Sequence, residues 1–126
     1  MQDIHATGAS DDGSANGTAF NKWCVEMREL GIRRNHPWGT EPPNYKRYME
    51  EVGFVDIHVQ INPWPFGPWM EDPRMKEIGN WQGQNTMQFM RAFDRRAGIK
   101  DGEGEAVIAA VQDEMKNPDI HMYAPL

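Results

Sequence analysis

The sequence predicts an α/β fold, α+β in content, with about four helices and two or three strands. Apolar residues recur at helical spacing in four segments, alternate with polar residues in one segment, and are separated by clusters of proline and glycine. The chain of 126 residues has the length of one ordinary domain. We therefore expect residues 1–126 to fold as a single domain.

The first half of the chain predicts two helices behind a polar start. Residues 1–5 are a candidate short strand, and residues 6–17, rich in glycine, serine and aspartate, are expected to form a flexible loop. Residues 18–34 carry a single apolar stripe and predict a helix. A second helix is expected over residues 44–52, with Gly53 at the position of a left-handed C-cap.

After Gly53 the apolar period changes from helical to two. Residues 55–61 alternate valine and isoleucine with polar side chains, which is the clearest strand signal in the chain. Residues 62–72 are dense in proline and tryptophan and are expected to form a loop. Asp72 and Pro73 then provide a capping aspartate and a proline suited to the first helical position.

The second half predicts two further helices and a strand. Residues 73–96 are expected to be helical, with an irregularity near residues 80–85, because glycine and asparagine recur there. Residues 105–116 bury a second apolar stripe. Residues 120–126 are a candidate final strand.

The charge balance excludes several classes of partner. The chain has 13 basic and 19 acidic residues, a net charge of -6, and no concentrated basic tract. Neither nucleic acid nor an anionic membrane is therefore expected as a partner. No apolar run approaches the roughly 20 residues of a membrane span. The single cysteine, Cys24, excludes an internal disulfide and fits a reducing compartment, so we expect a cytoplasmic protein.

Several short strings point together to a known family. They are EEVGFVDI at residues 50–57, NPWP at 62–65, GPW at 67–69, DPR at 72–74 and KEIG at 76–79. The series is similar to the LaeA-like proteins of filamentous fungi, which are class I S-adenosylmethionine-dependent methyltransferases associated with secondary metabolism. The resemblance implies part of a methyltransferase-like sheet, and it covers only the C-terminal half of that family.

The resemblance also implies that the cofactor-binding half is missing. In the family, a glycine-rich turn after an early strand holds S-adenosylmethionine. Residues 102–104 have the form Gly-Glu-Gly, but they follow a charged loop and lack a third glycine, so an ordinary turn is expected. We therefore expect no cofactor in this chain, with S-adenosylmethionine supplied by a partner as the alternative.

Aromatic residues are the main candidates for substrate contact. Indole rings offer large, rigid apolar surfaces with one hydrogen-bond donor each. Pure core packing of these residues remains the open alternative. The expected substrate-binding residues are Trp64, Phe66, Trp69, Trp81 and Tyr123.

Two histidines are candidates for proton transfer. His58 lies on the polar side of the predicted strand, and His121 belongs to the terminal motif that the resemblance covers. The histidines lack metal-ligand spacing, so no metal site is expected. Cys24 lies on an apolar helical stripe and is expected to be a buried, inert thiol.

These features favour a small protein of a fungal natural-product pathway, derived from a methyltransferase. We expect it to bind a small apolar intermediate and promote a cofactor-independent reaction, such as a cyclisation or cycloaddition, by orienting it. One alternative is the substrate side of a methyltransferase that needs a partner or a missing N-terminal half. Another is a noncatalytic regulatory or binding remnant.

The expected assembly is a homodimer. The candidate strand at residues 1–5 has no proline or lysine to protect its edge, and an unpaired strand edge invites pairing. A symmetric dimer would cover it.

Overall fold

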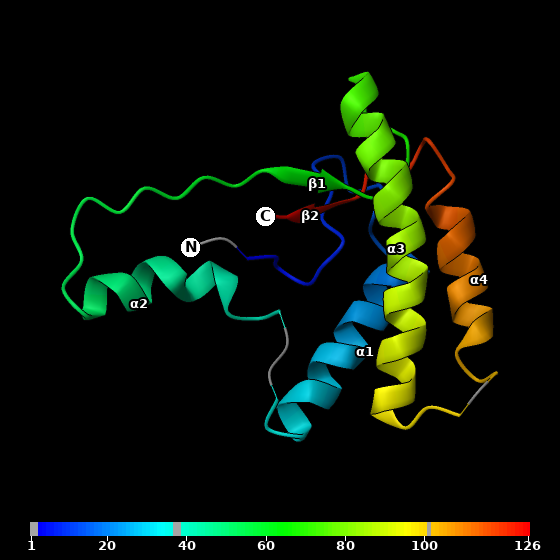
Figure 1. Cartoon of the computed structure of the whole chain (residues 1–126), viewed down its shortest axis with the longest axis horizontal. Coiled ribbons are helices and arrows are strands. Elements are labelled where there is room, and N and C mark those ends of the chain that lie inside the picture. The colour runs from blue at the N-terminus through cyan, green and yellow to red at the C-terminus, as the bar shows by residue number, and fades with distance from the viewer. Residues whose placement is uncertain (1–2, 37–38, 101) are drawn as a thin grey trace.

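A computed structural model describes residues 3–36, 39–100 and 102–126. The described residues form four α-helices, one short 3₁₀ helix and a two-stranded antiparallel sheet, which confirms the predicted fold class (Figure 1). Three of the helices pack side by side, while the fourth lies apart from them. The elements in chain order are α1 (Ala19–Arg33), η1 (Pro42–Asn44), α2 (Tyr45–Glu51), β1 (Pro63–Pro65), α3 (Pro73–Ala97), α4 (Glu105–Glu114) and β2 (Tyr123–Pro125).

The core lies between α1, α3, α4 and the sheet. Its centre is Trp23, whose ring meets the Phe93 ring edge-on at 5.7 Å and whose indole nitrogen donates to Asp94 Oδ1 at 3.0 Å. This hydrogen bond satisfies two buried polar groups that would otherwise be costly inside an apolar core. The most deeply buried apolar side chains around Trp23 include Cys24, Met90, Val111, Met122 and Ala124.

The start of α1 is held by two caps. The Thr18 side chain accepts a hydrogen bond from Asn21 N at 3.2 Å, as an N-cap threonine is expected to do. In addition, the Glu114 carboxylate of α4 accepts from the backbone N–H groups of Ala19 and Phe20, at 2.6 and 3.1 Å. A negative charge at a helix N-terminus is favourable, so Glu114 ties α4 to α1.

The long helix α3 begins as the sequence predicts. Asp72 accepts from Arg74 N and Met75 N at 2.8 and 3.1 Å, and Gly98 ends the helix in the left-handed conformation. The expected irregularity near residues 80–85 is wrong, because α3 is a continuous helix there. Tertiary packing outweighs the weak helix propensity of these residues, since the buried Gly79 and Gly83 are where the helix meets neighbouring chain.

The sheet pairs the segment that precedes α3 with the C-terminal segment. Trp64 of β1 pairs with Ala124 of β2, and the ladder continues outward through mutual hydrogen bonds of 2.9 and 3.0 Å between Asn62 and Leu126. The candidate strand at residues 120–126 is confirmed as β2. The expectation that residues 62–72 contain only loop is wrong, because β1 forms where β2 provides a partner.

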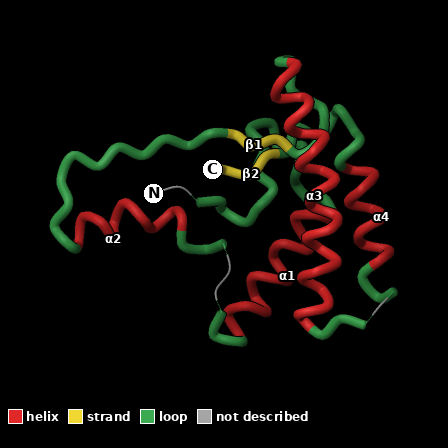
Figure 2. The backbone as a smooth tube through the Cα atoms, viewed as in Figure 1, coloured by secondary structure: helices red, strands yellow, loops and turns green. Residues whose placement is uncertain are grey.

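The strongest strand signal does not become a strand. Residues 55–61 run outside any strand, and Asp56 adopts a left-handed φ of 55°. Alternating apolar residues need a neighbouring strand to pair with, and the described part of the chain offers none. Together with α2, this segment forms an arm that extends away from the three packed helices (Figure 2).

The N-terminal prediction is also corrected. Met1 and Gln2 lie outside the described residues, and residues 3–5 are not in a strand. His5 N nevertheless donates to Pro125 O at 3.0 Å, next to β2. Residues 6–17 form bends, turns and one isolated bridge, between Ala9 and Tyr123.

The contact between β1 and α3 generates a stability prediction. A methyl group on Gly79 would overlap the carbonyl oxygen of Gly67, which follows β1. Gly79→Ala should therefore lower the free energy of unfolding by about 1–3 kcal/mol, the usual cost of overpacking. Chemical denaturation measures this change.

Gly83→Ala is the matched control for that experiment. A methyl group there would meet its nearest neighbour, Met115 Cβ, at 3.4 Å, an ordinary contact. The control should be neutral or slightly stabilising, because alanine is a better helix former than glycine. Equal destabilisation by both variants would contradict the assignment of the close contact to Gly79.

Candidate functional site

A cavity of about 470 Å³ opens between α1, α3 and the end of the sheet. Its apolar walls include Phe20 and Trp23 of α1, Phe89 of α3, and Phe66 just after β1. The Phe20 and Phe66 rings pack with their centroids 4.9 Å apart. The aromatic residues come from three separate elements, so the fold is what assembles this wall.

One face of α3 contributes polar side chains to the cavity, and further polar side chains come from Asp3, His5, Thr7, Glu41 and Tyr45. Gln82, Asn85 and Thr86 line it, at a spacing that places them on one helical face. The Thr86 hydroxyl donates to Gln82 O at 2.8 Å and is buried. The amides of Gln82 and Asn85 can each donate and accept hydrogen bonds, which suits the recognition of a carbonyl or hydroxyl group.

The N-terminal segment and α2 also line the cavity. Burial lowers the pKa of His5, and the charge of Arg28 lowers it further. The His5 imidazole is therefore neutral at pH 7 and presents one donor and one acceptor. Tyr45 of α2 also lines the cavity, and its hydroxyl donates to the Asp3 carboxylate.

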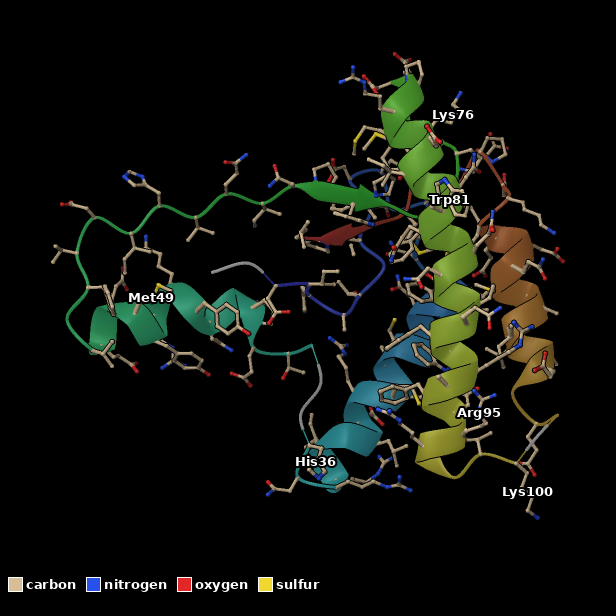
Figure 3. All side chains as sticks on the ribbon, viewed as in Figure 1. His36, Met49, Lys76, Trp81, Arg95 and Lys100 are labelled. Carbon is tan, nitrogen blue, oxygen red and sulfur yellow. The ribbon has the colours of Figure 1, made fainter. Side chains whose placement is uncertain are left out.

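The five aromatic residues predicted to bind substrate do not come together. Phe66 lines the cavity, whereas the other four are not part of its described lining. Trp64 is half-buried in β1, and its indole nitrogen is buried with no hydrogen-bond partner among the described residues. Trp81 is 65% exposed on the surface of α3 (Figure 3).

A second group of side chains gathers around His121, and we call it the His121 cluster. It consists of Asp11, Asp12, Ser14, Trp69, His121 and Tyr123. His121 Nδ1 lies 2.7 Å from Asp12 Oδ2, and the Trp69 ring packs 5.2 Å from the imidazole. The backbone N–H of His121 donates to Ser14 Oγ at 2.8 Å. Tyr123 donates its hydroxyl proton to Asp11 Oδ1 at 2.8 Å.

The charges of the His121 cluster are set by hydrogen bonds. Ser14, through its hydroxyl and its backbone N–H, lowers the pKa of Asp12 to about 2, with a smaller effect from His121. The hydrogen bond to Asp11 raises the pKa of Tyr123. Tyr123 is therefore a donor, and Asp12 is an acceptor that orients His121. Such a pair leaves Nε2 of the ring for proton exchange with an outside group.

His58, the second predicted catalytic residue, lies exposed on the arm. It is not part of the described lining of the cavity or of the His121 cluster. The described residues contain no group of three histidine, cysteine or acidic side chains arranged to hold a metal ion. Within the same residues, no helix is both long enough and apolar enough to cross a membrane.

The cavity uses residues that sequence reasoning did not assign to a site. Phe20 and Trp23 belong to the apolar stripe of α1 and were expected in the core. Gln82 and Asn85 fell in the region predicted to be irregular, and Thr86 lies just after it. Their spacing of three and one is the signal that could have placed them on one helical face.

Comparisons with known proteins find relatives in fungi. The chain is 27% identical over 132 residues to the probable methyltransferase tdiE of Emericella nidulans. This match covers all of this chain and 41% of the relative. It is 27% identical to the secondary metabolism regulator laeA of Monascus pilosus, over 90% of this chain and 32% of the relative. The chain is homologous to LaeA-like methyltransferases of filamentous fungi.

A further LaeA-like relative is described as an enzyme. The protein-methionine methyltransferase laeA of Emericella nidulans is 23% identical over 90% of this chain. The chain spans less than half the length of these relatives, 32–41%. No protein-family profile matches the chain, and no solved structure matches it.

The thiol of Cys24 lines the cavity but should be unreactive. Burial raises the pKa of Cys24 to about 12, so almost no thiolate exists at pH 8. We expect 5,5′-dithiobis(2-nitrobenzoic acid) to label the native chain far more slowly than the urea-unfolded chain. Labelling of both states at the same rate would contradict the burial of Cys24.

The pKa of Asp12 predicts how stability depends on pH. Its folded value of about 2 lies below the ordinary 3.8, so its stabilising effect is complete above pH 4 and is lost as the pH falls towards 2. Asp12→Asn should flatten this part of the stability curve, measured by denaturation between pH 2 and pH 5. Ser14→Ala should flatten it partly, because Ser14 contributes the largest lowering. An unchanged curve in Asp12→Asn would show that Asp12 has no such role.

Proposed function

We propose that this chain is a methyltransferase-derived protein of a fungal secondary-metabolite pathway that binds a small apolar intermediate in its aromatic cavity. The single observation that supports this is the cavity itself. Its volume of about 470 Å³ lies in the range of small-molecule sites, and its lining combines aromatic side chains with polar groups from several segments. The relatives support the link to secondary metabolism.

We propose that the reaction is a cofactor-independent cyclisation or cycloaddition. Phe20, Trp23 and Phe66 would hold a flexible apolar substrate in one conformation, and orientation of this kind can lower a barrier by several kcal/mol. The amides of Gln82 and Asn85 would donate to a substrate carbonyl and polarise it. A reaction promoted by orientation requires only noncovalent contacts. This agrees with the cavity lining, because burial raises the pKa of its one thiol, Cys24, and keeps it from acting as a nucleophile.

In this proposal the substrate binds in the cavity, and of the substrate-binding residues predicted from the sequence only Phe66 lines it. His121 and Trp69 would act only on a group that reaches the His121 cluster, which contributes nothing to the described lining of the cavity. His58 has no place in the proposed reaction.

A second candidate function follows from the relatives. Two relatives are named as methyltransferases, which favours the hypothesis that this chain forms the substrate side of such an enzyme. A partner would then bind S-adenosylmethionine. A regulatory binding role, as the description of other relatives suggests, would also use the cavity.

A blocking substitution tests whether the cavity binds a ligand. Asn85→Trp should place an indole at the cavity wall without removing any core atoms, because Asn85 is exposed on α3. Binding of the neutral fluorescent probe N-phenyl-1-naphthylamine should weaken at least tenfold. Asn80→Trp is the matched control, since Asn80 is exposed on the same helix and is not among the lining residues.

Three outcomes separate the candidates. Equal probe binding by the wild type and both variants would overturn the cavity as a ligand site. Titration calorimetry with S-adenosylmethionine should show no micromolar binding, and a micromolar affinity would instead favour the methyltransferase candidate. Co-expression with neighbouring pathway enzymes, with and without this chain, should change the product if the chain is catalytic.

A further inference from the structure

The lining of the cavity is negatively charged. It includes the carboxylates of Asp3 and Glu41, and no lysine or arginine is among the lining residues that the structure describes. His5 adds no charge at pH 7, because burial and the charge of Arg28 lower its pKa. Arg28 acts on His5 from α1, outside that described lining. The charge of the lining therefore bears on which ligands the cavity accepts.

Hydrogen bonds from α2 hold both carboxylates. Tyr45 donates its hydroxyl proton to Asp3 Oδ2, and Tyr48, one turn further along α2, donates to Glu41 Oε2 at 2.6 Å. The hydrogen bond to Asp3 raises the pKa of Tyr45, and the charges of Asp3 and Glu41 raise it further. Both negative charges therefore act at Tyr45, which itself lines the cavity. Each carboxylate oxygen has two lone pairs, so both groups keep acceptor capacity for a ligand.

The aromatic part of the lining suits the body of a positively charged organic ligand. Phe20, Trp23, Phe66 and Phe89 supply rings that bury apolar surface, and the face of an aromatic ring attracts a cation. The two carboxylates would repel an anion and would leave a neutral ligand largely unaffected. Such walls suit a carbon skeleton that carries the charge better than a metal ion, which needs oxygen or nitrogen ligands on all sides.

We propose that the ligand of this cavity is an apolar amine that is protonated at pH 7. Its carbon skeleton would pack against the rings of Phe20 and Phe66, and its ammonium group would donate hydrogen bonds to the carboxylates of Asp3 and Glu41. Hydrogen bonds between charged groups are stronger than neutral ones, so the ammonium group would decide which apolar molecules bind well. This inference rests on the proposed function, because it names the class of substrate for the same cavity.

Three probes of similar shape test the charge preference. At pH 7, 1-naphthylmethylamine is a cation, 1-naphthalenemethanol is neutral and 1-naphthoate is an anion. In competition with N-phenyl-1-naphthylamine for the full chain, the amine should bind about tenfold or more tightly than the alcohol, because it alone is attracted by the carboxylates. The naphthoate should bind more weakly than the alcohol. High salt should reduce the preference for the amine, because salt screens exposed charges.

Neutral isosteres test whether the two carboxylates cause the preference. Glu41→Gln and Asp3→Asn should each lower the ratio of amine to alcohol affinity about threefold or more, and the double variant should abolish the preference. Glu77→Gln is the matched control, because it removes the same charge from an exposed position of α3 outside the described lining. Binding of the neutral N-phenyl-1-naphthylamine should be the same in all these variants, which would show that the cavity is intact.

The outcomes separate this inference from the proposed function. Equal affinity for the amine and the alcohol in the wild type, or an unchanged ratio in the double variant, would overturn the amine while leaving the cavity as a ligand site. Failure of every probe to bind would overturn the proposed function, and this inference with it. Displacement of the probe by micromolar S-adenosylmethionine, which also carries a positive charge, would assign the carboxylates to that cofactor and overturn the amine.

Discussion

The contact between the backbones of Gly67 and Gly79 is the constraint on which the rest of the arrangement depends. Gly67 N donates to Gly79 O at 3.0 Å, although Gly79 lies within a helix, and neither position tolerates a Cβ atom. This contact sets β1 directly against α3. It thereby places Phe66 against Phe20 in the cavity wall and sets the direction in which the arm leaves the core. A single steric requirement thus links the sheet, the cavity and the arm.

Two polar anchors complete the helical layer. The Trp23–Asp94 hydrogen bond joins α1 to α3 inside the core, and the Glu114 carboxylate joins α4 to the start of α1. Both satisfy groups that burial would otherwise penalise, so both favour one register of the helices over neighbouring ones. With the register set, Gln82 and Asn85 face the aromatic wall rather than solvent alone. The polarity of the cavity is therefore a consequence of helix packing.

Much of the secondary structure could be predicted, because helices depend on nearby residues. The apolar stripe ending at Leu30, the Asp72 cap and the Gly98 stop each act within a few residues, and the structure places helices where these signals lie. The site was less accessible to prediction. Phe66, a predicted substrate-binding residue, lies in the cavity lining, whereas Trp81 is exposed on α3 and is not part of that lining. Proximity in the chain says little about which side of a helix faces a cavity.

The sequence by itself determined the helix positions, the acidic charge and the resemblance to LaeA-like methyltransferases, because each is a property of residue order alone. Only the tertiary structure decided which strands form. Residues 55–61 have the stronger strand pattern, yet Pro63–Pro65 forms β1, because a strand exists only where a second segment meets its hydrogen-bonding groups. The pairing of His121 with Asp12, 109 positions apart, was decided in the same way. Contacts between distant segments depend on packing, which no local pattern encodes.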